Sequence, residues 1–526
     1  MREALNRWPW YAAVLAAYPM LHIAVTNPGQ VEAGDVLPVV AVGIAAAFAL
    51  VAILRSVMGT WTAAGLGAAW VALLFYLYAP VNEWWMDWVR SGLEQQAAEE
   101  TWYRSHPQLV HSTAWALVAL AGLARLRLSA KRIPGSVTGA LNVVAALLVA
   151  LIAVQAVSHA AKDRGKPAGS VASNVARAPS ATAGPDIYFI VLDGYARADV
   201  LAKYYQYDNA PFLEGLRSRG FQVSDASRSN FYWTFLSIGS SLNLDYVQKL
   251  APGTLAAGER DRTELYRLLR DNRASHFLRE RGYRYVALQS TWGGTASNPY
   301  ADTFLPCQAG LFGNEYLRAV ADASWLRALG SQASMDIASC HLQNFETLAA
   351  QAKAPGPKFV FAHFVPPHHP YLFDRDGNVL RRATISDQFE FQKRLWEDRR
   401  SYVGQLEYVN RRIGAAVDRL IADSPRPPVI LLISDHGPNL RVGMREPEQR
   451  HVRLSNLTAM YLPGAPAGFL PADETPVNHL RRVFNLYFDA KLPVLPDRYF
   501  VSSYLQPYEL QEVDLANEVL PEQRGF

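Results

Sequence analysis

The chain has 526 residues, of which half are hydrophobic and only 19% are charged. This length exceeds that of one ordinary domain, and the small net charge of +4 gives no reason to expect a nucleic-acid partner. The sequence contains no glycine-rich phosphate loop or dinucleotide fingerprint, which argues against a nucleotide-driven enzyme. The shortage of charge is concentrated before residue 160, where long apolar stretches recur.

Five stretches in this N-terminal part are long and apolar enough to cross a bilayer, which requires about 20 residues. Buried core helices of a soluble protein are the alternative, and five stretches in succession make it the weaker one. The first stretch does not resemble a cleavable signal, because four more follow it and no clear small-residue cleavage site does. The predicted spans are residues 8–26, 36–54, 61–79, 109–126 and 137–157.

The charges of the connecting loops predict how these spans are oriented. Basic residues precede the first span and occupy the second and fourth loops, whereas the first and third loops are acidic. The basic loops therefore face the cytoplasm, and five spans place the rest of the chain outside it. In a bacterium with two membranes, the sequence predicts a multi-pass inner-membrane protein with a periplasmic domain. The basic residues are Arg2, Arg7, Arg55, Arg125, Arg127, Lys131 and Arg132.

Composition divides the chain into three parts. Residues 1–159 form the predicted membrane domain, and four tryptophans near residues 82–103 favour an interfacial helix at the headgroup level over an ordinary exposed loop. Residues 160–185 are rich in Ala, Ser, Gly, Pro and Lys and show no periodicity, which is typical of a flexible linker. Residues 186–526 form the predicted extracytoplasmic domain.

The outer domain alternates predicted strands and helices. Short apolar runs at residues 187–192, 285–289, 359–364 and 429–433 predict strands. Helical periodicity separates them at residues 199–217, 262–281 and 389–421. This alternation is typical of an α/β domain with a mainly parallel sheet that helices cover on both faces.

Two of the predicted strands end on potential metal ligands. The first runs into Asp193, and the fourth runs into Asp435 and His436; a glycine follows each. Ligands of open α/β sheets gather at the carboxyl ends of the strands, so these side chains are expected to meet. Carboxylate oxygens and an imidazole nitrogen suit a divalent cation, either Zn²⁺ or Mn²⁺. A polar turn at each strand end is the alternative.

Thr234 is the candidate nucleophile, because the sequence around it predicts a loop that enters a helix. The first turn of a helix offers free backbone N–H groups and the positive end of the helix dipole, which favour an alkoxide and an anionic substrate. A nearby dication lowers the pKa of a hydroxyl further. A helix cap is the alternative role for Thr234, and Ser237, Ser240 and Ser241 are rival nucleophiles.

Three histidines occur within seven residues around the end of the third strand: His363, His368 and His369. Histidine at such a place can donate to a phosphoryl oxygen or protonate a leaving group, so this cluster favours a functional role over a structural one. Trp292, after the second strand, is expected either to line the substrate pocket or to belong to the hydrophobic core. His451, in a basic loop, is a further candidate for contact with the substrate.

The only two cysteines, Cys307 and Cys340, both lie in the outer domain. Because an oxidising compartment permits a disulfide, we predict a bridge between them rather than two unpaired thiols.

Taken in order along the chain, these motifs resemble the alkaline phosphatase superfamily, in its sulfatase-like branch. Five spans before an extracytoplasmic domain resemble lipoteichoic acid synthases and phosphoethanolamine transferases. The resemblance implies that Thr234 attacks a phosphodiester and carries a covalent intermediate, and that His363 and His368 contact the substrate. The metal ligands that it implies are Asp193, Thr234, Asp435 and His436.

The sequence departs from the family pattern in two respects. The first ligand, often Glu in the transferases, is Asp193 here. No cysteine has the Cys/Ser-x-Pro-x-Arg context of true sulfatases, and threonine cannot form their aldehyde, so sulfate ester hydrolysis is the weaker expectation.

The resemblance therefore implies a metal-dependent transferase. Its expected donor is a membrane phospholipid with a phosphoglycerol or phosphoethanolamine headgroup, and its expected acceptor is an envelope glycan or lipid. A phosphodiester or sulfate ester hydrolase and a non-catalytic, membrane-tethered scaffold are the alternatives.

Overall fold

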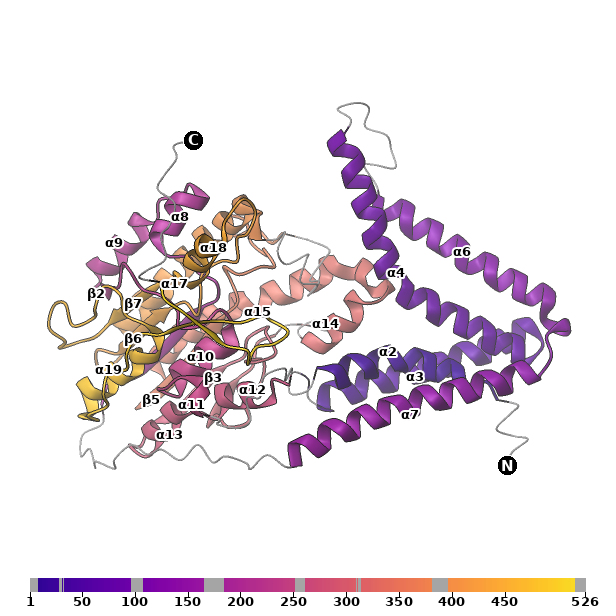
Figure 1. The fold of residues 1–526 in the computed structure, drawn as a ribbon, viewed down its shortest axis with the longest axis horizontal. Helices are drawn as coiled ribbons and strands as arrows, with labels where there is room; N and C mark the ends of the chain where they lie inside the picture. Colours follow the sequence, from indigo (N-terminus) through magenta and orange to yellow (C-terminus); the bar gives the residue numbers. More distant parts are fainter. Residues whose placement is uncertain are drawn as a thin grey trace. The chain divides into compact units, whose positions relative to one another are not determined.

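The computed structural model describes residues 8–27, 31, 33–95, 107–164, 184–250, 261–308, 310, 314–380 and 396–515. The chain divides into two compact units. One combines the N-terminal helices with residues Asn314–Ala333, and the other holds most of the remaining chain (Figure 1).

The first unit is built from apolar helices. Four of them, α3, α4, α6 and α7, are long and apolar enough to cross a membrane. The first predicted span is also a helix, α2, but its 16 residues extend only about 24 Å, less than the roughly 30 Å of a bilayer core. The elements are α2 (Tyr11–Thr26), α3 (Ala33–Met58), α4 (Trp61–Gln95), α6 (Pro107–Ser129), η1 (Ala130–Arg132), α7 (Ser136–Arg164), α14 (Glu315–Asp322) and η3 (Trp325–Leu329).

Helix α4 is longer than the predicted span. Its 35 residues extend about 52 Å, which exceeds a bilayer core by about 20 Å, and Pro80 lies inside it without ending it. The predicted interfacial helix near residues 82–103 is therefore, up to Gln95, the continuation of α4 and not a separate element. Residues 96–103, like most of the predicted linker, lie outside the described part of the chain.

A segment from the middle of the predicted outer domain belongs to this helical unit. Tyr316, on α14, is buried against α2 and α3, and its hydroxyl donates to the carbonyl of Met20 (2.9 Å). The Arg327 guanidinium, with its side chain 5% exposed, forms an ion pair with Glu83 on α4 (2.6 Å). The outer domain is therefore not one continuous stretch of sequence, since Asn314–Ala333 folds with the N-terminal helices.

The second unit contains a seven-stranded sheet with the order β2-β7-β6-β1-β5-β3-β4. The central strand, β1, pairs in parallel with β5 and β6, and within this sheet the antiparallel pairings described are those that β7 makes with β2 and β6. The predicted mainly parallel sheet is confirmed. Its strands are β1 (Ile187–Leu192), β2 (Phe221–Val223), β3 (Arg284–Leu288), β4 (Thr303–Leu305), β5 (Lys358–Phe364), β6 (Val429–Ile433) and β7 (Thr458–Tyr461); β8 (Tyr499–Val501) and β9 (Gln511–Val513) form a separate ribbon.

Helices cover both faces of this sheet (Figure 1). Side chains alternate along β1: Ile187 enters a core shared with α10, α12, α13 and α19, whereas Tyr188 enters the opposite core, shared with α8, α9, α15 and α17. The helices are α8 (Ala198–Tyr205), α9 (Ala210–Ser218), α10 (Thr234–Leu242), α11 (Val247–Leu250), α12 (Thr263–Arg270), α13 (Arg273–Arg279), α15 (Gly330–Ala350), η4 (Gln351–Lys353), α17 (Arg399–Asp423), α18 (Glu446–Leu454) and α19 (Pro476–Phe488).

Two of the predicted long helices are each interrupted. The first breaks at Gln206, whose left-handed backbone (φ 52°) ends α8. The second breaks at Asn272, whose side chain accepts a hydrogen bond from the Ser275 N–H and so begins a new helix, α13. Periodicity continues across both breaks, so it did not reveal them.

Cys307 and Cys340 form a disulfide that joins the segment after β4 to α15. The two cysteines lie 33 residues apart in the sequence, and the chain between them contains Asn314–Ala333. The bridge therefore holds together the two sides of the segment that folds with the membrane helices.

Candidate active site

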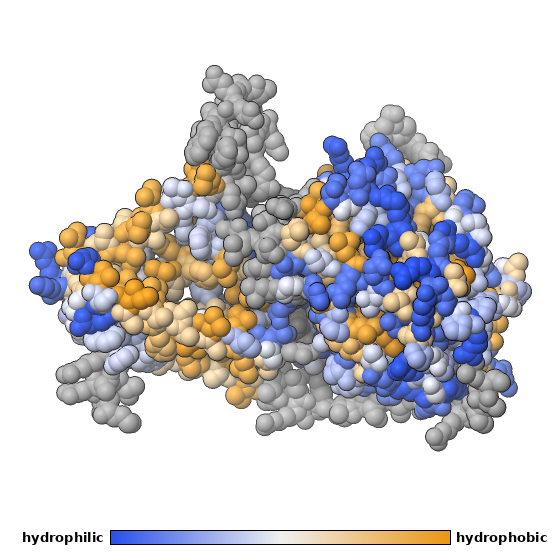
Figure 2. Space-filling view, turned by 180° about the vertical axis from the view of Figure 1, so that it is seen from behind, coloured by the Kyte–Doolittle hydropathy of each residue, from blue (hydrophilic) through white to orange (hydrophobic). Residues whose placement is uncertain are grey.

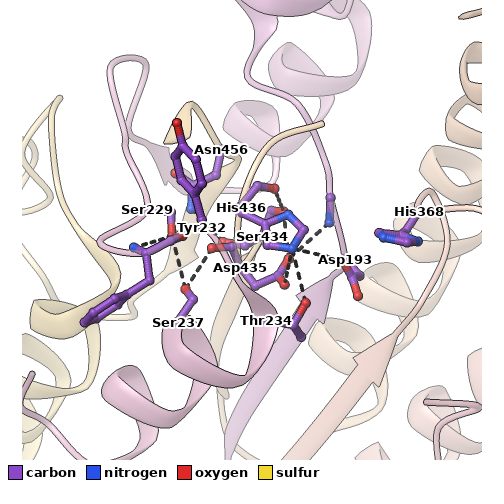
Figure 3. A network of polar contacts seen from close by, with 12 residues as sticks. Asp193, Ser229, Tyr232, Thr234, Ser237, His368, Ser434, Asp435, His436 and Asn456 are labelled. Carbon is purple, nitrogen blue, oxygen red and sulfur yellow. Dashed lines mark hydrogen bonds and ion pairs between the residues drawn. The ribbon is translucent and has the colours of Figure 1, made fainter. Parts of the chain in front are cut away.

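The site forms where three neighbouring parallel strands end. Val191 on β1 pairs with His363 on β5 and with Ile433 on β6, so these strands reach the same edge of the sheet in register. This register brings Asp193 beside Asp435, although about 240 residues separate them in the chain. Figure 3 shows Asp193, Thr234, Asp435 and His436 converging there.

The glycines that follow Asp193 and His436 are required by the geometry. Gly194 has a left-handed backbone (φ 65°), and its N–H donates to Asp435 Oδ1 (3.1 Å). A Cβ on Gly437 would lie 2.2 Å from the carbonyl oxygen of Val452, so only glycine allows these backbones to approach so closely. Both glycines thus fix the positions of the side chains that precede them.

Asp193, Asp435 and His436 form a buried cluster in which one ligand atom from each lies within 4.8 Å of the others. His436 Nδ1 donates to the carbonyl of Gly437 (3.0 Å), which leaves the lone pair of Nε2 facing the cluster. Nε2 lies 3.2 Å from Asp435 Oδ2 and 3.1 Å from Thr234 Oγ1. The imidazole nitrogen, the hydroxyl and the two carboxylates therefore face a common point.

This donor set fits a divalent cation. Asp193 Oδ1 and Asp435 Oδ2 are buried and have no hydrogen-bond partner among the described residues. Burial raises the pKa of both carboxyl groups, because no solvent stabilises their charges. A dication would balance two buried carboxylates, and the mixture of oxygen and nitrogen donors suits Zn²⁺ and Mn²⁺ alike.

Among the candidate nucleophiles, Thr234 is the one whose hydroxyl faces the cluster. It is the first residue of α10, and Trp233 before it has an extended backbone. The three rival serines lie deeper in the helix and are engaged elsewhere. Ser237 donates to the backbone carbonyl of Asp435 (2.7 Å), Ser241 donates to a carbonyl within α10 (2.9 Å), and Ser240 accepts from an N–H of α11 (3.2 Å).

His363 lies beside the cluster. Its Nε2 is 3.5 Å from Asp193 Oδ2, and its Nδ1 is hydrogen-bonded to Thr295 Oγ1 (2.9 Å). Trp292 packs edge-on against the ring (centroids 5.5 Å apart), so it supports His363. Burial lowers the pKa of His363 to about 4, which keeps the ring neutral at pH 7.

The two histidines after β5 have different environments. The backbone N–H of His368 donates to the carbonyl of Asp193 (3.0 Å), and its Nδ1 donates to the carbonyl of His369 (2.6 Å), which leaves Nε2 available. Its ring centroid lies 6.4 Å from that of His436. His369 is buried against Trp396, and its Nε2 has no hydrogen-bond partner among the residues described. Of the two, His368 is the better placed for proton transfer.

His451 makes its contacts elsewhere. The predicted basic loop around it is a helix, α18, and His451 Nε2 lies 3.4 Å from Asp199 Oδ2, outside the cluster. The residue of α18 that reaches the site is Arg453. His451 and Arg453 are two positions apart, which corresponds to a rotation of about 200° around an α-helix. Their side chains therefore project from opposite faces of α18.

Arg453 is a functional candidate that the sequence did not reveal. Its side chain is buried between Trp233 and Trp396. Its Nη2 donates to the lone pair of His436 Nε2 (3.0 Å). Its Nη1 donates to the Gly437 carbonyl (2.8 Å), and its Nε donates to the carbonyl of Tyr232 (3.0 Å). Burial lowers its pKa to about 10, which still leaves a positive charge at pH 7. The site therefore contains a fixed cation beside His436.

Comparison with known proteins finds a family similarity in the middle and later part of the chain. The family model named Sulfatase matches residues 274–479, a region that includes β5, β6 and α18. This region of the chain is similar to the sulfatase family. This match agrees with the predicted resemblance to the sulfatase-like branch of the alkaline phosphatase superfamily. No curated protein sequence matches the chain significantly.

Solved structures similar to the chain include three phosphoethanolamine transferases. The periplasmic domain of EptC from Escherichia coli is 14% identical, with 66% of this chain and 96% of that chain covered and a TM-score of 0.42. EptA from Neisseria meningitidis, an integral membrane protein, is 15% identical (74% and 71% covered, TM-score 0.37). EptC from Campylobacter jejuni is 12% identical (53% and 79% covered, TM-score 0.34). Because these TM-scores are below 0.5, the similarity to the sulfatase family rests on the family model alone.

Proposed function

We propose that this protein is a metal-dependent transferase of the bacterial inner membrane, with its catalytic domain in the periplasm. It transfers a phosphorylated headgroup, of the phosphoglycerol or phosphoethanolamine type, from a membrane phospholipid to an envelope glycan or lipid. The observation that carries the proposal is the position of Thr234. Its hydroxyl lies at the first turn of α10 and 3.1 Å from His436 Nε2, beside two buried carboxylates.

The proposed reaction has two displacements at phosphorus. In the first, Thr234 Oγ1 forms a bond to phosphorus as the bond to the diacylglycerol oxygen breaks. We assign the proton transfer to His368 Nε2, which takes the proton of Thr234 and passes it to the departing diacylglycerol. In the second, an acceptor hydroxyl displaces Thr234, and the proton moves in reverse. A bound Zn²⁺ or Mn²⁺, held by Asp193, Thr234, Asp435 and His436, would lower the pKa of the attacking hydroxyl and offset phosphoryl charge.

Arg453 supplies the second positive charge in this scheme. Its guanidinium is held by two backbone carbonyls and flanked by two indole rings, so its direction is fixed before a substrate arrives. Guanidinium groups match phosphate geometry. We therefore infer that Arg453 contacts a non-bridging oxygen of the phosphodiester.

Hydrolysis of a sulfate ester is the second candidate, because the matching family is named Sulfatase. Sulfatases of that kind use an aldehyde made from cysteine or serine. Both cysteines of this chain are in the disulfide, and the hydroxyl at the cluster belongs to Thr234, which cannot form an aldehyde. These two observations favour phosphoryl transfer. The buried ligand atoms without partners argue against a non-catalytic scaffold.

The proposal is tested by trapping the intermediate. Full-length protein loaded with Zn²⁺ or Mn²⁺ is incubated with phosphatidylethanolamine or phosphatidylglycerol without an acceptor, and its intact mass is measured. We expect a gain of one phosphorylated headgroup, which peptide fragmentation places on Thr234. Continuous release of free headgroup without an adduct would instead identify a hydrolase, and the absence of both would contradict the proposal.

The role of Arg453 has its own test. Replacing Arg453 by glutamine is expected to lower kcat/KM for the phospholipid donor by about 100-fold, because a hydrogen bond to a charged oxygen is lost in the transition state. Arg450→Gln is the matched control, since Arg450 lies on the same helix and pairs with Glu446 (3.0 Å). Arg453→Lys is expected to recover only part of the rate. Equal activity of the Arg453→Gln and Arg450→Gln proteins would show that Arg453 has no such role.

A further inference from the structure

The helical unit contains an apolar cavity of about 520 Å³ between α2, α4, α6 and α7. This volume is within the range of small-molecule sites. Trp70 and Tyr76 line it, but their polar atoms are engaged: Trp70 Nε1 donates to the Ala119 carbonyl (3.3 Å) and the Tyr76 hydroxyl donates to the Ala16 carbonyl (2.6 Å). These aromatic residues therefore offer the cavity mainly apolar surface. The charged group in the lining is Arg125.

Arg125 belongs to the basic end of the helical unit. Arg127 donates to the carbonyl of Val57, so the ends of α6 and α3 meet there. Residues 36–82 and 107–162 contain no Asp or Glu, so these stretches of the helices provide no carboxylate to neutralise that end. Figure 2 shows hydrophilic residues gathered at one end of the otherwise apolar unit. The cations of this end are Arg55, Arg125, Arg127, Lys131 and Arg132.

The basic end lies far from the point at which the chain leaves the helical unit. Helix α7 begins at Ser136, just after the basic segment, and its 29 residues extend about 43 Å to Arg164. That length exceeds the roughly 30 Å of a bilayer core. Since clustered cations mark the cytoplasmic side, Arg125 places the charged part of the cavity lining toward the leaflet opposite the one that the catalytic domain is proposed to use.

We propose that this cavity binds an acyl chain of an anionic glycerophospholipid of the cytoplasmic leaflet, and that Arg125 binds its phosphate. The apolar lining matches the chain, and the basic rim complements a headgroup with net negative charge. An acyl chain at this place would fill space between four helices that side chains leave open. This lipid is a resident ligand, distinct from the donor of the transfer reaction.

The site is tested on the full-length protein in nanodiscs that contain phosphatidylglycerol with a photoreactive group in its acyl chain. We expect labelled peptides to map to residues 66–77 and 122–126, which line the cavity. Labelling spread evenly over exposed residues of α6 and α7, such as Leu117 and Leu147, would overturn the proposal. The labelling pattern does not depend on turnover. Failure of the lipid-binding proposal can therefore be distinguished from failure of the proposed function.

A second experiment tests the role of the cation. Native mass spectrometry measures retained phosphatidylglycerol against phosphatidylcholine for the wild type, Arg125→Gln and Arg132→Gln. Arg125→Gln is expected to lower the retained phosphatidylglycerol about fivefold, whereas Arg132→Gln, which removes a charge outside the cavity lining, is expected to have less effect. Equal losses in both variants, or equal retention of the two lipids by the wild type, would overturn phosphate recognition by Arg125. If Arg125→Gln fails to fold, Arg125→Lys provides the comparison.

Discussion

Replacing Thr234 by alanine is expected to lower kcat/KM for a phospholipid donor by at least about 1,000-fold, because removal of a nucleophile leaves only binding and electrostatic effects. The hydroxyl lies 3.1 Å from His436 Nε2, and none of the serines of α10 replaces it, since all three are engaged in structural hydrogen bonds. The measurement is headgroup release from a labelled phospholipid. The variant is also expected to show no covalent adduct by intact mass.

Two variants make this result interpretable. Thr234→Ser keeps the hydroxyl and is expected to retain measurable turnover and the adduct. Ser241→Ala removes a hydroxyl of the same helix that donates to a backbone carbonyl, and its kcat/KM is expected to stay close to that of the wild type. If Thr234→Ala keeps full turnover, the covalent mechanism is wrong, even if the protein still transfers headgroups.

Replacing Asp435 by asparagine is expected to remove both the divalent cation and the activity. Even partners of metal ligands cost 10- to 100-fold in affinity when they are lost, so a direct carboxylate ligand should cost at least about 100-fold. The fold itself should survive. Burial and the neighbouring Asp193 raise the pKa of Asp435, which means that its charge destabilises the metal-free folded protein above its unfolded pKa. A neutral amide of the same shape removes that cost.

The measurements are the metal content of the purified protein and its thermal melting with and without added Zn²⁺ or Mn²⁺. The wild type is expected to melt at a higher temperature when metal is added, because the cation binds the folded state. Asp435→Asn should show no such increase, while its metal-free form should melt no lower than that of the wild type. Asp199→Asn is the control, since Asp199 pairs with Arg197 and His451. A metal-dependent rise in the Asp435→Asn protein would contradict the assignment.

The proximity of Asp193 and Asp435 could be predicted because strong local signals mark the ends of their strands. Runs of apolar residues in β1 and β6 end at carboxylates, and the parallel pairing of these strands then brings Asp193 and Asp435 together. Thr234 was predictable as the start of a helix. These features depend on short stretches of sequence and on a general rule about where sheets bind ligands.

Other features depended on contacts that no local pattern encodes. Arg453 was missed because the sequence around it is typical of a polar loop. Its contact with His436 depends on which face of α18 packs against the site, and no local pattern reveals this. The placement of Tyr316 against α2 joins residues almost 300 positions apart. Periodicity also merged α8 with α9, since one left-handed residue, Gln206, is enough to end a helix.

The segment Asn314–Ala333 bears on how the protein can be divided. A cut between residues 165 and 183 would separate the N-terminal helices from everything that follows. The fragment after the cut would still contain Asn314–Ala333, although this segment folds with the N-terminal helices. Tyr316 would then lose the apolar surface that buries it, and Arg327 would lose its partner Glu83. The resulting fragment would expose an apolar patch to water, which favours aggregation. A well-behaved soluble fragment therefore also requires excision of this segment, at a place where the Cys307–Cys340 bridge already holds the two flanks together.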